Sequence, residues 1–244
     1  MCAAPAGSDE YYINLKQKGY VVVHNVISKA SAESLLKAVP FVSQNTKSQS
    51  RWKVLFQNIA AKETGKRKQE GVGKGRYYCN VFQEMCVYEP VIFNILKDLN
   101  LVGETHELSK NGSIALIHSD GETETNRNQS FHFDYDFEHK CFKREKGDYV
   151  SSFPVSVIVA LEGHTNLNVF EGSCGSEVDG FKKGIAIPML SALVFRGDLH
   201  HGGGSYTIPN TRLHLYYDIP GVIETTFVED VKGTRDLCVF WVNE

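Results

Sequence analysis

The 244-residue sequence lacks the features that mark several classes of protein. No apolar run approaches transmembrane length, and residues 1–10 contain neither the basic n-region nor the apolar h-region of a signal peptide. The six cysteines include no C-x-x-C pair, which argues against a zinc knuckle and a disulfide scaffold. The net charge of −3 gives no global attraction to nucleic acid or membranes. These absences favour a cytoplasmic protein with reduced thiols.

The order of predicted elements indicates one domain over residues 11–244 after a disordered lead over residues 1–10. Helical patterns cover 11–19, 28–39 and 91–99. Strand patterns cover 20–27, 113–118, 130–135, 155–161, 167–170, 184–188, 192–195, 212–218 and 237–242. Helices followed by about eight short strands predict a mostly β fold with flanking helices, namely a double-stranded β-helix (jelly roll, cupin-like).

Two H-x-D pairs are candidates for part of a metal site. His132 and Asp134 lie in an aromatic segment predicted to be a strand, where the period of two places both side chains on one face. His118 and Asp120 form the second pair, but Asp120-Gly121 is a turn signal that gives Asp120 an ordinary role at the end of a strand. This context favours His132 and Asp134.

The third metal ligand is expected in the segment Gly-Asp-Leu-His-His-Gly-Gly-Gly, where either His200 or His201 is suitable. The three glycines after His201 favour that residue, because they leave room for a co-substrate. Two imidazoles and one carboxylate can hold Fe(II) on one face and leave three positions open.

Arg212 begins a predicted strand in which it shares one face with His214 and Tyr216. Polar side chains in the interior of a barrel need partners, and a cavity that binds an anion provides them. A structural salt bridge to Arg212 is the alternative.

Several segments together resemble the Fe(II)/2-oxoglutarate-dependent oxygenases, on the phytanoyl-CoA-dioxygenase-like side of that superfamily. They are the opening Gly19–Ser28, the segment Gln129-x-x-His132-x-Asp134, the turn Glu171-Gly-Ser173, the segment Gly197–Gly202, and Asn210-Thr-Arg212. The resemblance covers residues 11–220.

The resemblance implies that His132, Asp134 and His201 bind Fe(II) and that Arg212 binds the distal carboxylate of 2-oxoglutarate. It implies O2 as co-substrate, ascorbate as a reductant, and conversion of 2-oxoglutarate to succinate and CO2. His214 stands where many relatives carry a serine, so this sequence departs from the pattern there, and Gln129 is a further candidate for co-substrate binding. Because Asp134 is retained, hydroxylation, desaturation or oxidative cyclisation is favoured over halogenation.

The substrate is expected to be a small, anionic metabolite. Residues 62–76 contain six basic and two acidic residues, a net charge of +4, and form either a solvated surface loop or an active-site lid that attracts an anion. The candidate substrate contacts are Trp52, Arg76, Tyr78, Asn80, Tyr135, Phe170 and Arg196.

Two other functions are compatible with these residues. The chain is either an oxygenase of protein or peptide side chains, or a cupin-like protein that binds metal without catalysis. No basic surface interleaved with aromatic residues indicates nucleic-acid binding, and a monomer or weak dimer is expected.

Overall fold

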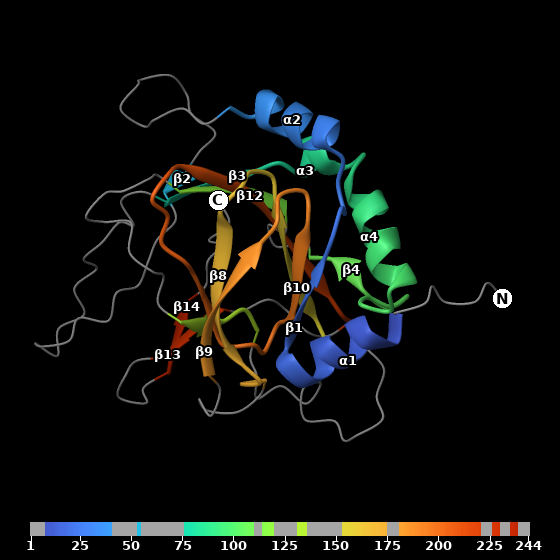
Figure 1. Ribbon diagram of the computed structural model, residues 1–244, viewed down its shortest axis with the longest axis vertical. Helices are drawn as coiled ribbons and strands as arrows, with labels where there is room; N and C mark the ends of the chain where they lie inside the picture. Colours follow the sequence, from blue (N-terminus) through green and yellow to red (C-terminus); the bar gives the residue numbers. More distant parts are fainter. Residues whose placement is uncertain are drawn as a thin grey trace, which may run out of the picture.

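The computed structural model describes residues 8–40, 53–54, 76–109, 114–119, 131–135, 153–174, 181–220, 226–229 and 235–238. Within these ranges the chain forms two β-sheets packed face to face, with helices along one side (Figure 1). The major sheet has eight strands and the minor sheet has six. None of the described helices is both long enough and apolar enough to cross a membrane.

Each sheet joins strands that are far apart in the sequence. The major sheet has the order β1 (Tyr20–Val23), β10 (Ala192–Arg196), β7 (Val155–Ala160), β12 (Asn210–Asp218), β5 (Ile114–Ser119), β3 (Arg76–Asn80) and β2 (Lys53–Val54), and β4 (Glu107–Leu108) also pairs with β12. The minor sheet has the order β14 (Arg235–Cys238), β13 (Thr226–Glu229), β6 (His132–Phe133), β11 (His201–Gly203), β8 (Thr165–Glu171) and β9 (Phe181–Ile187). From β5 onward the chain passes back and forth between the two antiparallel sheets, which confirms the predicted jelly roll.

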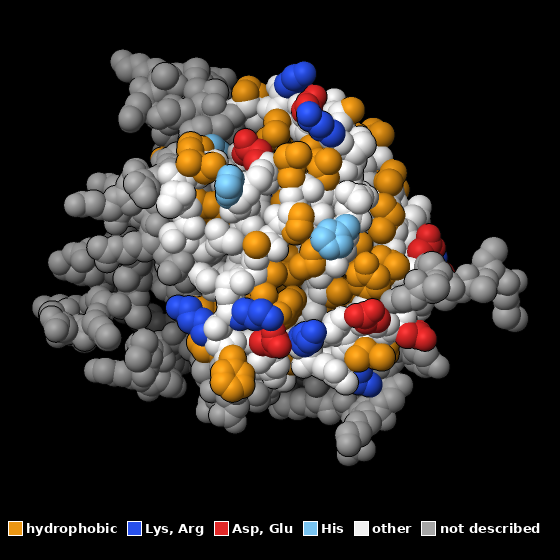
Figure 2. Space-filling view, in the orientation of Figure 1, with side chains coloured by type: hydrophobic (Ala, Val, Ile, Leu, Met, Phe, Trp, Pro, Cys, Tyr) orange, Lys and Arg blue, Asp and Glu red, His pale blue; other side chains and the backbone are white. Residues whose placement is uncertain are grey.

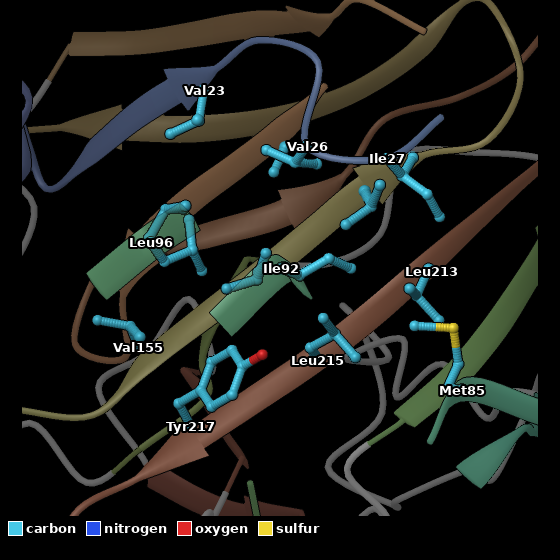
Figure 3. Close-up of a cluster of buried hydrophobic side chains, with 14 of the residues drawn as sticks. Val23, Val26, Ile27, Met85, Ile92, Leu96, Val155, Leu213, Leu215 and Tyr217 are labelled. Atoms are coloured by element: carbon cyan, nitrogen blue, oxygen red, sulfur yellow. The ribbon is translucent and has the colours of Figure 1, made fainter. Parts of the chain in front are cut away.

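The outer face of the major sheet is covered by helices. These are α1 (Ser8–Lys18), α2 (Lys29–Ala38), α3 (Phe82–Met85) and α4 (Glu89–Asp98). The residues of β7 and β12 on this face are mostly apolar, and Val155, Leu213 and Leu215 pack with Ile92 and Leu96 of α4 (Figure 3). The period of two along a strand therefore produces a mostly apolar layer between the sheet and the helices.

The inner face of the major sheet is divided between apolar and polar residues. On β1, β10 and β7 it carries apolar side chains that pack against β8 and β9, and Phe195 and Ile158 belong to this buried cluster. On β12 the inner face instead carries Arg212, His214 and Tyr216, all buried. The apolar side of the sandwich holds the sheets together, and the side near β12 contains polar groups that need partners.

The helix starts follow local signals. Ser28 is the predicted N-cap of α2, and its Oγ accepts a hydrogen bond from the Ser31 N–H at 3.1 Å. The helix α1 begins at Ser8, within the predicted lead and earlier than the predicted start at residue 11. Asp9 and Glu10 lie in its first turn, where the helix dipole stabilises negative charge.

Three strands differ from the sequence-based expectation because tertiary contacts override local pattern. The first strand ends at Val23 rather than at residue 27, because Asn25 adopts a left-handed φ of 57°. The strand β11 was not predicted, because its His-Gly-Gly sequence has low β propensity and pairing with β6 and β8 fixes it. The last predicted strand, 237–242, is found at Arg235–Cys238, and residues 239–242 lie outside the described ranges.

The count and the lengths of the strands also differ from expectation. From β5 to β14 the described residues form ten strands rather than about eight. The strand β6 has only two residues rather than the predicted span 130–135, because Tyr135 leaves it and its N–H donates to the Gly197 carbonyl at 3.2 Å. The strand β3 was also missed, because it directly follows the polar, glycine-rich stretch 62–76.

Gly197 is predicted to be intolerant of a side chain. A Cβ at this position would lie 2.1 Å from the Tyr135 ring, which is fully buried. Gly197→Ala is therefore expected to lower the free energy of unfolding by about 1–3 kcal/mol through overpacking. Gly163→Ala is the matched control, because a Cβ there would meet no atom within 4 Å. Equal urea midpoints for the two variants would contradict the packing described here.

Candidate metal centre

His132 and Asp134 converge at the end of the short strand β6. His132 lies on β6, Asp134 follows it after one residue, and both side chains are buried. The His132 Nε2 lies 3.7 Å from the Asp134 Oδ1, so an imidazole nitrogen and a carboxylate oxygen face the same point. The spacing of two residues places both groups on the inner side of the minor sheet, as the sequence predicted.

His201 joins this pair from the neighbouring strand β11. It is the direct register partner of His132, and its Nε2 lies 3.5 Å from the Asp134 Oδ1. One donor atom from each of the three residues lies within 4.8 Å of the others. Among the residues that the structure describes, this is the group of His, Cys, Asp and Glu side chains that could hold a metal ion.

The hydrogen bonds of His201 leave the correct nitrogen available for a metal. Its Nδ1 lies 2.9 Å from the Leu199 carbonyl oxygen and donates to it, which places the lone pair on Nε2. Burial, with a contribution from His200, lowers the pKa of His201 to about 4. His201 is therefore neutral near pH 7, as a metal-binding imidazole must be.

Asp134 is oriented by a hydroxyl from the opposite sheet. The Ser156 Oγ on β7 donates to the Asp134 Oδ2 at 2.5 Å, so the Oδ1 is the oxygen that faces both histidines. Burial raises the pKa of Asp134 to about 6, and this rise is opposed by His132 and by the Ser156 hydrogen bond. A bound cation would compensate for burial of this carboxylate, and the donor set of two imidazoles and one carboxylate fits Fe(II).

His200, the alternative third ligand, points to the other side of the minor sheet. Its ring stacks on Phe133 at 4.7 Å and on Phe170 at 5.1 Å, with interplanar angles of 16° in both pairs. Its backbone N–H donates to the Ser173 Oγ at 3.2 Å, in the turn singled out in the sequence. His200 is thus an aromatic packing residue, and the geometry favours His201 at the metal.

His118, from the second H-x-D pair, also faces away from the centre. It is the register partner of Tyr77 and Thr211, and its Nδ1 lies 2.8 Å from the Thr211 Oγ1. Thr211 alternates with Arg212 along β12, so its side chain lies on the opposite, helix-covered face. His118 and Tyr77 are aligned with Thr211 across the sheet and share that face. Asp120 lies outside the described residues.

Arg212 and His214 lie on the inner face of β12, beside the three candidate ligands. The Arg212 Nη1 donates to the Tyr206 hydroxyl at 3.3 Å. Burial lowers the pKa of His214 well below its usual value, and Arg212, His201 and His132 lower it further. The His214 Nε2 is buried without a hydrogen-bond partner. An anion between the metal and Arg212 would pair with both groups, so these residues fit a dicarboxylate co-substrate.

Two candidate substrate contacts share the inner face of the major sheet. Asn80 pairs in register with Ala115, which pairs with His214, and Tyr78 pairs with Ile117, which pairs with Arg212. Residues opposite one another in antiparallel strands lie on one face of a sheet. Tyr78 and Asn80 therefore lie on the same face as Arg212 and His214.

The other candidates are placed differently. Arg76 occupies the register position next to Ser119 on the same sheet. Trp52, Gln129 and most of the stretch 62–76 lie outside the described residues.

Tyr135, Phe170 and Arg196, which were expected to contact substrate, each have other partners within the structure. The buried Tyr135 hydroxyl donates to the Asp218 Oδ1 at 2.6 Å. Phe170 packs on the outer side of the minor sheet against His200. Arg196 forms two hydrogen bonds to Asp198, at 2.8 and 2.6 Å. Its position after Phe195 places it on the outer face of β10, where its guanidinium lies over the Phe153 ring. Period-two alternation could have indicated this orientation of Arg196.

Ser156 and Tyr206 were missed by sequence reasoning. A signal for Ser156 exists, because it is the one polar residue in the strand sequence Val-Ser-Val-Ile-Val-Ala. A polar side chain in a strand that is buried on both faces requires a partner. Tyr206 lies in a connection whose sequence contains no pattern that indicates a contact with Arg212.

Removal of a metal ligand is predicted to abolish tight binding of a divalent metal. His132→Ala, Asp134→Ala and His201→Ala are each expected to weaken Ni(II) or Co(II) binding by about 100-fold or more. His118→Ala and His200→Phe serve as controls, because both side chains face away from the centre. Calorimetric titration of the metal-free protein checks this, and loss of binding in His118→Ala with retention in His132→Ala would reverse the assignment.

Ser156→Ala tests the hydrogen bond that orients Asp134. Without the hydroxyl, the carboxylate loses its fixed orientation, and metal affinity is expected to fall by about 10- to 100-fold. The same metal titration provides the measurement. An unchanged affinity would show that Ser156 does not hold the carboxylate in place.

Comparison with known proteins identifies the fold. No family model matches the chain, and no curated protein matches its sequence. The epimerase SnoN from nogalamycin biosynthesis, solved with Fe3+, alpha ketoglutarate and nogalamycin RO, is 14% identical, with a TM-score of 0.56 over 93% of this chain and 87% of SnoN. HygX from Streptomyces hygroscopicus, solved with nickel, 2-oxoglutarate and hygromycin B, is 11% identical, with a TM-score of 0.57 over 88% of each chain. The chain therefore has the same jelly-roll fold as these two solved proteins.

Proposed function

We propose that the protein is an Fe(II)- and 2-oxoglutarate-dependent oxygenase that activates a C–H bond of a small, anionic metabolite. The observation that carries this proposal is the buried cluster of His132, Asp134 and His201 beside Arg212 on the facing sheet. A protein that only binds metal has no need for a buried arginine at this position. The solved structures with the same fold contain a metal and 2-oxoglutarate, which supports the same chemistry here.

The three candidate ligands would hold Fe(II) from the minor sheet. Bound iron, with 2-oxoglutarate and O2, supplies the oxidising power for C–H activation. His201 presents its Nε2 because its Nδ1 is engaged by Leu199, and Asp134 presents its Oδ1 because its Oδ2 is engaged by Ser156. These hydrogen bonds fix the donor directions before a metal arrives.

Arg212 and His214 would hold the distal carboxylate of 2-oxoglutarate, with Gln129 as a further candidate outside the described residues. A guanidinium can donate two parallel hydrogen bonds to a carboxylate. Tyr206 accepts from the Arg212 Nη1 and thereby helps to fix the direction of the guanidinium. The apolar cluster beside the site, which includes Phe195 packed against the His201 ring at 4.7 Å, excludes water on that side.

Residues around the centre support a class of reaction and a class of substrate. Retention of Asp134 favours hydroxylation, desaturation or oxidative cyclisation over halogenation. SnoN and HygX bind nogalamycin RO and hygromycin B, which supports a small-molecule substrate. Tyr78 and Asn80 on the inner face, with Arg76 and Trp52, are the candidate substrate contacts, and the basic stretch 62–76 favours an anion.

The remaining expectations concern partners and location. On the face shown in Figure 2, basic and acidic side chains of the described residues are interspersed rather than gathered in one basic patch. The net charge of −3 gives no global attraction to a polyanion, so we propose that the protein does not bind nucleic acid. We further propose that the protein is cytoplasmic and that it is a monomer or a weak dimer.

Succinate formation tests the proposed function. The protein with Fe(II), ascorbate and O2 is expected to convert 2-oxoglutarate to succinate, and a substrate from a metabolite panel should accelerate this turnover. Asp134→Ala is expected to abolish succinate formation, whereas His118→Ala should retain it. Unchanged turnover in Asp134→Ala would refute the assignment, and acceleration by peptides alone would favour a peptide substrate.

Arg212 variants test the co-substrate site. Arg212→Ala removes charge-assisted hydrogen bonds and is expected to raise the KM for 2-oxoglutarate by about 10- to 100-fold. Arg212→Lys keeps the charge but loses the bidentate geometry, so a smaller increase is expected. An unchanged KM in both variants would indicate that Arg212 has only a structural role.

A further inference from the structure

His214 and Tyr216 form a pair of rings side by side on the inner face of β12. Their centroids are 4.4 Å apart, and the Tyr216 hydroxyl lies 3.3 Å from the His214 Nδ1. The other ring nitrogen, Nε2, is buried without a hydrogen-bond partner. Burial of an unpaired polar atom is unfavourable, and His214 shares the inner face of β12 with Arg212, so a ligand held by Arg212 could pair with this nitrogen.

The position of His214 indicates which ligand that is. Ser156, which binds Asp134, is the register partner of Tyr216, whereas Arg212 lies four residues away along β12. At about 3.4 Å per residue, Arg212 and Tyr216 are separated by roughly 14 Å along β12, and His214 lies midway between them. A dicarboxylate held at one end by the metal and at the other by Arg212 would therefore pass His214.

The hydrogen bond to Tyr216 decides which proton His214 carries. A neutral imidazole has one N–H and one lone pair, and a phenol hydroxyl is a good donor to the lone pair. If Tyr216 donates to Nδ1, the His214 proton is on Nε2, the nitrogen that has no hydrogen-bond partner within the protein. The low pKa of His214 keeps the ring neutral, so this tautomer determines whether Nε2 donates or accepts.

We propose that Tyr216 is a positioning residue that holds His214 in its Nε2–H tautomer, so that Nε2 donates to the distal carboxylate of the dicarboxylate bound by Arg212. This inference rests on the proposed function. It assigns a role to the residue that replaces the serine of many relatives, and it adds Tyr216 to the site.

Tyr216 is itself fixed by its surroundings. Its ring packs edge-on against Tyr135 at 6.5 Å, and the Tyr135 hydroxyl donates to Asp218 at 2.6 Å. The Tyr216 carbonyl accepts from the Ser109 N–H at 2.9 Å. Because these contacts already restrict the Tyr216 ring, its hydroxyl can orient the His214 ring with little further loss of conformational entropy.

The test measures binding of two ligands to the Ni(II)-loaded protein by calorimetry. 2-Oxoglutarate has a distal carboxylate, whereas pyruvate has the same chelating groups without it. Tyr216→Phe is expected to weaken 2-oxoglutarate binding by about 3- to 10-fold. His214→Ala should weaken it by at least as much, and His214→Gln, which retains an N–H donor, should recover part of that loss. Neither Tyr216→Phe nor His214→Ala should change pyruvate binding.

A variant that combines His214→Ala with Tyr216→Phe distinguishes a positioning role of Tyr216 from a general effect on the structure. In the His214→Ala background, Tyr216→Phe should cause no further loss, because its action passes through His214. Equal losses in both backgrounds, or an equal loss for pyruvate, would overturn the role of Tyr216 and leave the proposed function intact. If the Ni(II)-loaded wild-type protein does not bind 2-oxoglutarate, both the proposed function and this inference fail.

Tautomer populations provide a readout that does not depend on the ligand. Nitrogen NMR of protein with 15N-labelled histidine should show His214 protonated on Nε2, with His214→Gln used to assign the signal. Tyr216→Phe should shift this population toward Nδ1–H. A wild-type signal protonated on Nδ1, or one that Tyr216→Phe leaves unchanged, would overturn the inference.

Discussion

The candidate site depends on one buried carboxylate, that of Asp134. Ser156 from the major sheet donates to one of its oxygens, and His132 and His201 from the minor sheet face the other. Burial of a carboxylate is unfavourable unless it is paired, so these contacts and a cation must compensate for the lost hydration. The two sheets therefore have to pack at the separation that brings Ser156 to Asp134.

The interior of the jelly roll meets this requirement by dividing into two regions. Between β1, β10, β7 and the strands β8 and β9, apolar side chains fill the space and hold the sheets together. Beside β12, the same inner face carries Arg212, His214 and Tyr216. The packed region supplies rigidity, and the polar region supplies donors for an anion. This division explains why buried polar groups persist beside β12, whereas the other core, under the helices, is mostly apolar.

Sequence patterns predicted the fold class and the placement of the central residues, but they failed for residues whose role depends on the opposite sheet. His132 and Asp134 were placed on one face by the period of two, and the same period grouped Arg212 with His214. Ser156 was missed, because its partner Asp134 lies on the opposite sheet. Strand β11 was missed, because long-range pairing rather than residue propensity creates it.

The sequence by itself determined the chemistry of the donors and their spacing along each strand, because side-chain type and strand periodicity are local properties. It left two choices open, between His118 and His132 and between His200 and His201. The tertiary structure favours His132 and His201. Register places His118 on the helix-covered face, and aromatic stacking holds His200 on the far side of the minor sheet. Which of two neighbouring histidines meets a carboxylate depends on how the two sheets pack, and local sequence does not encode that packing.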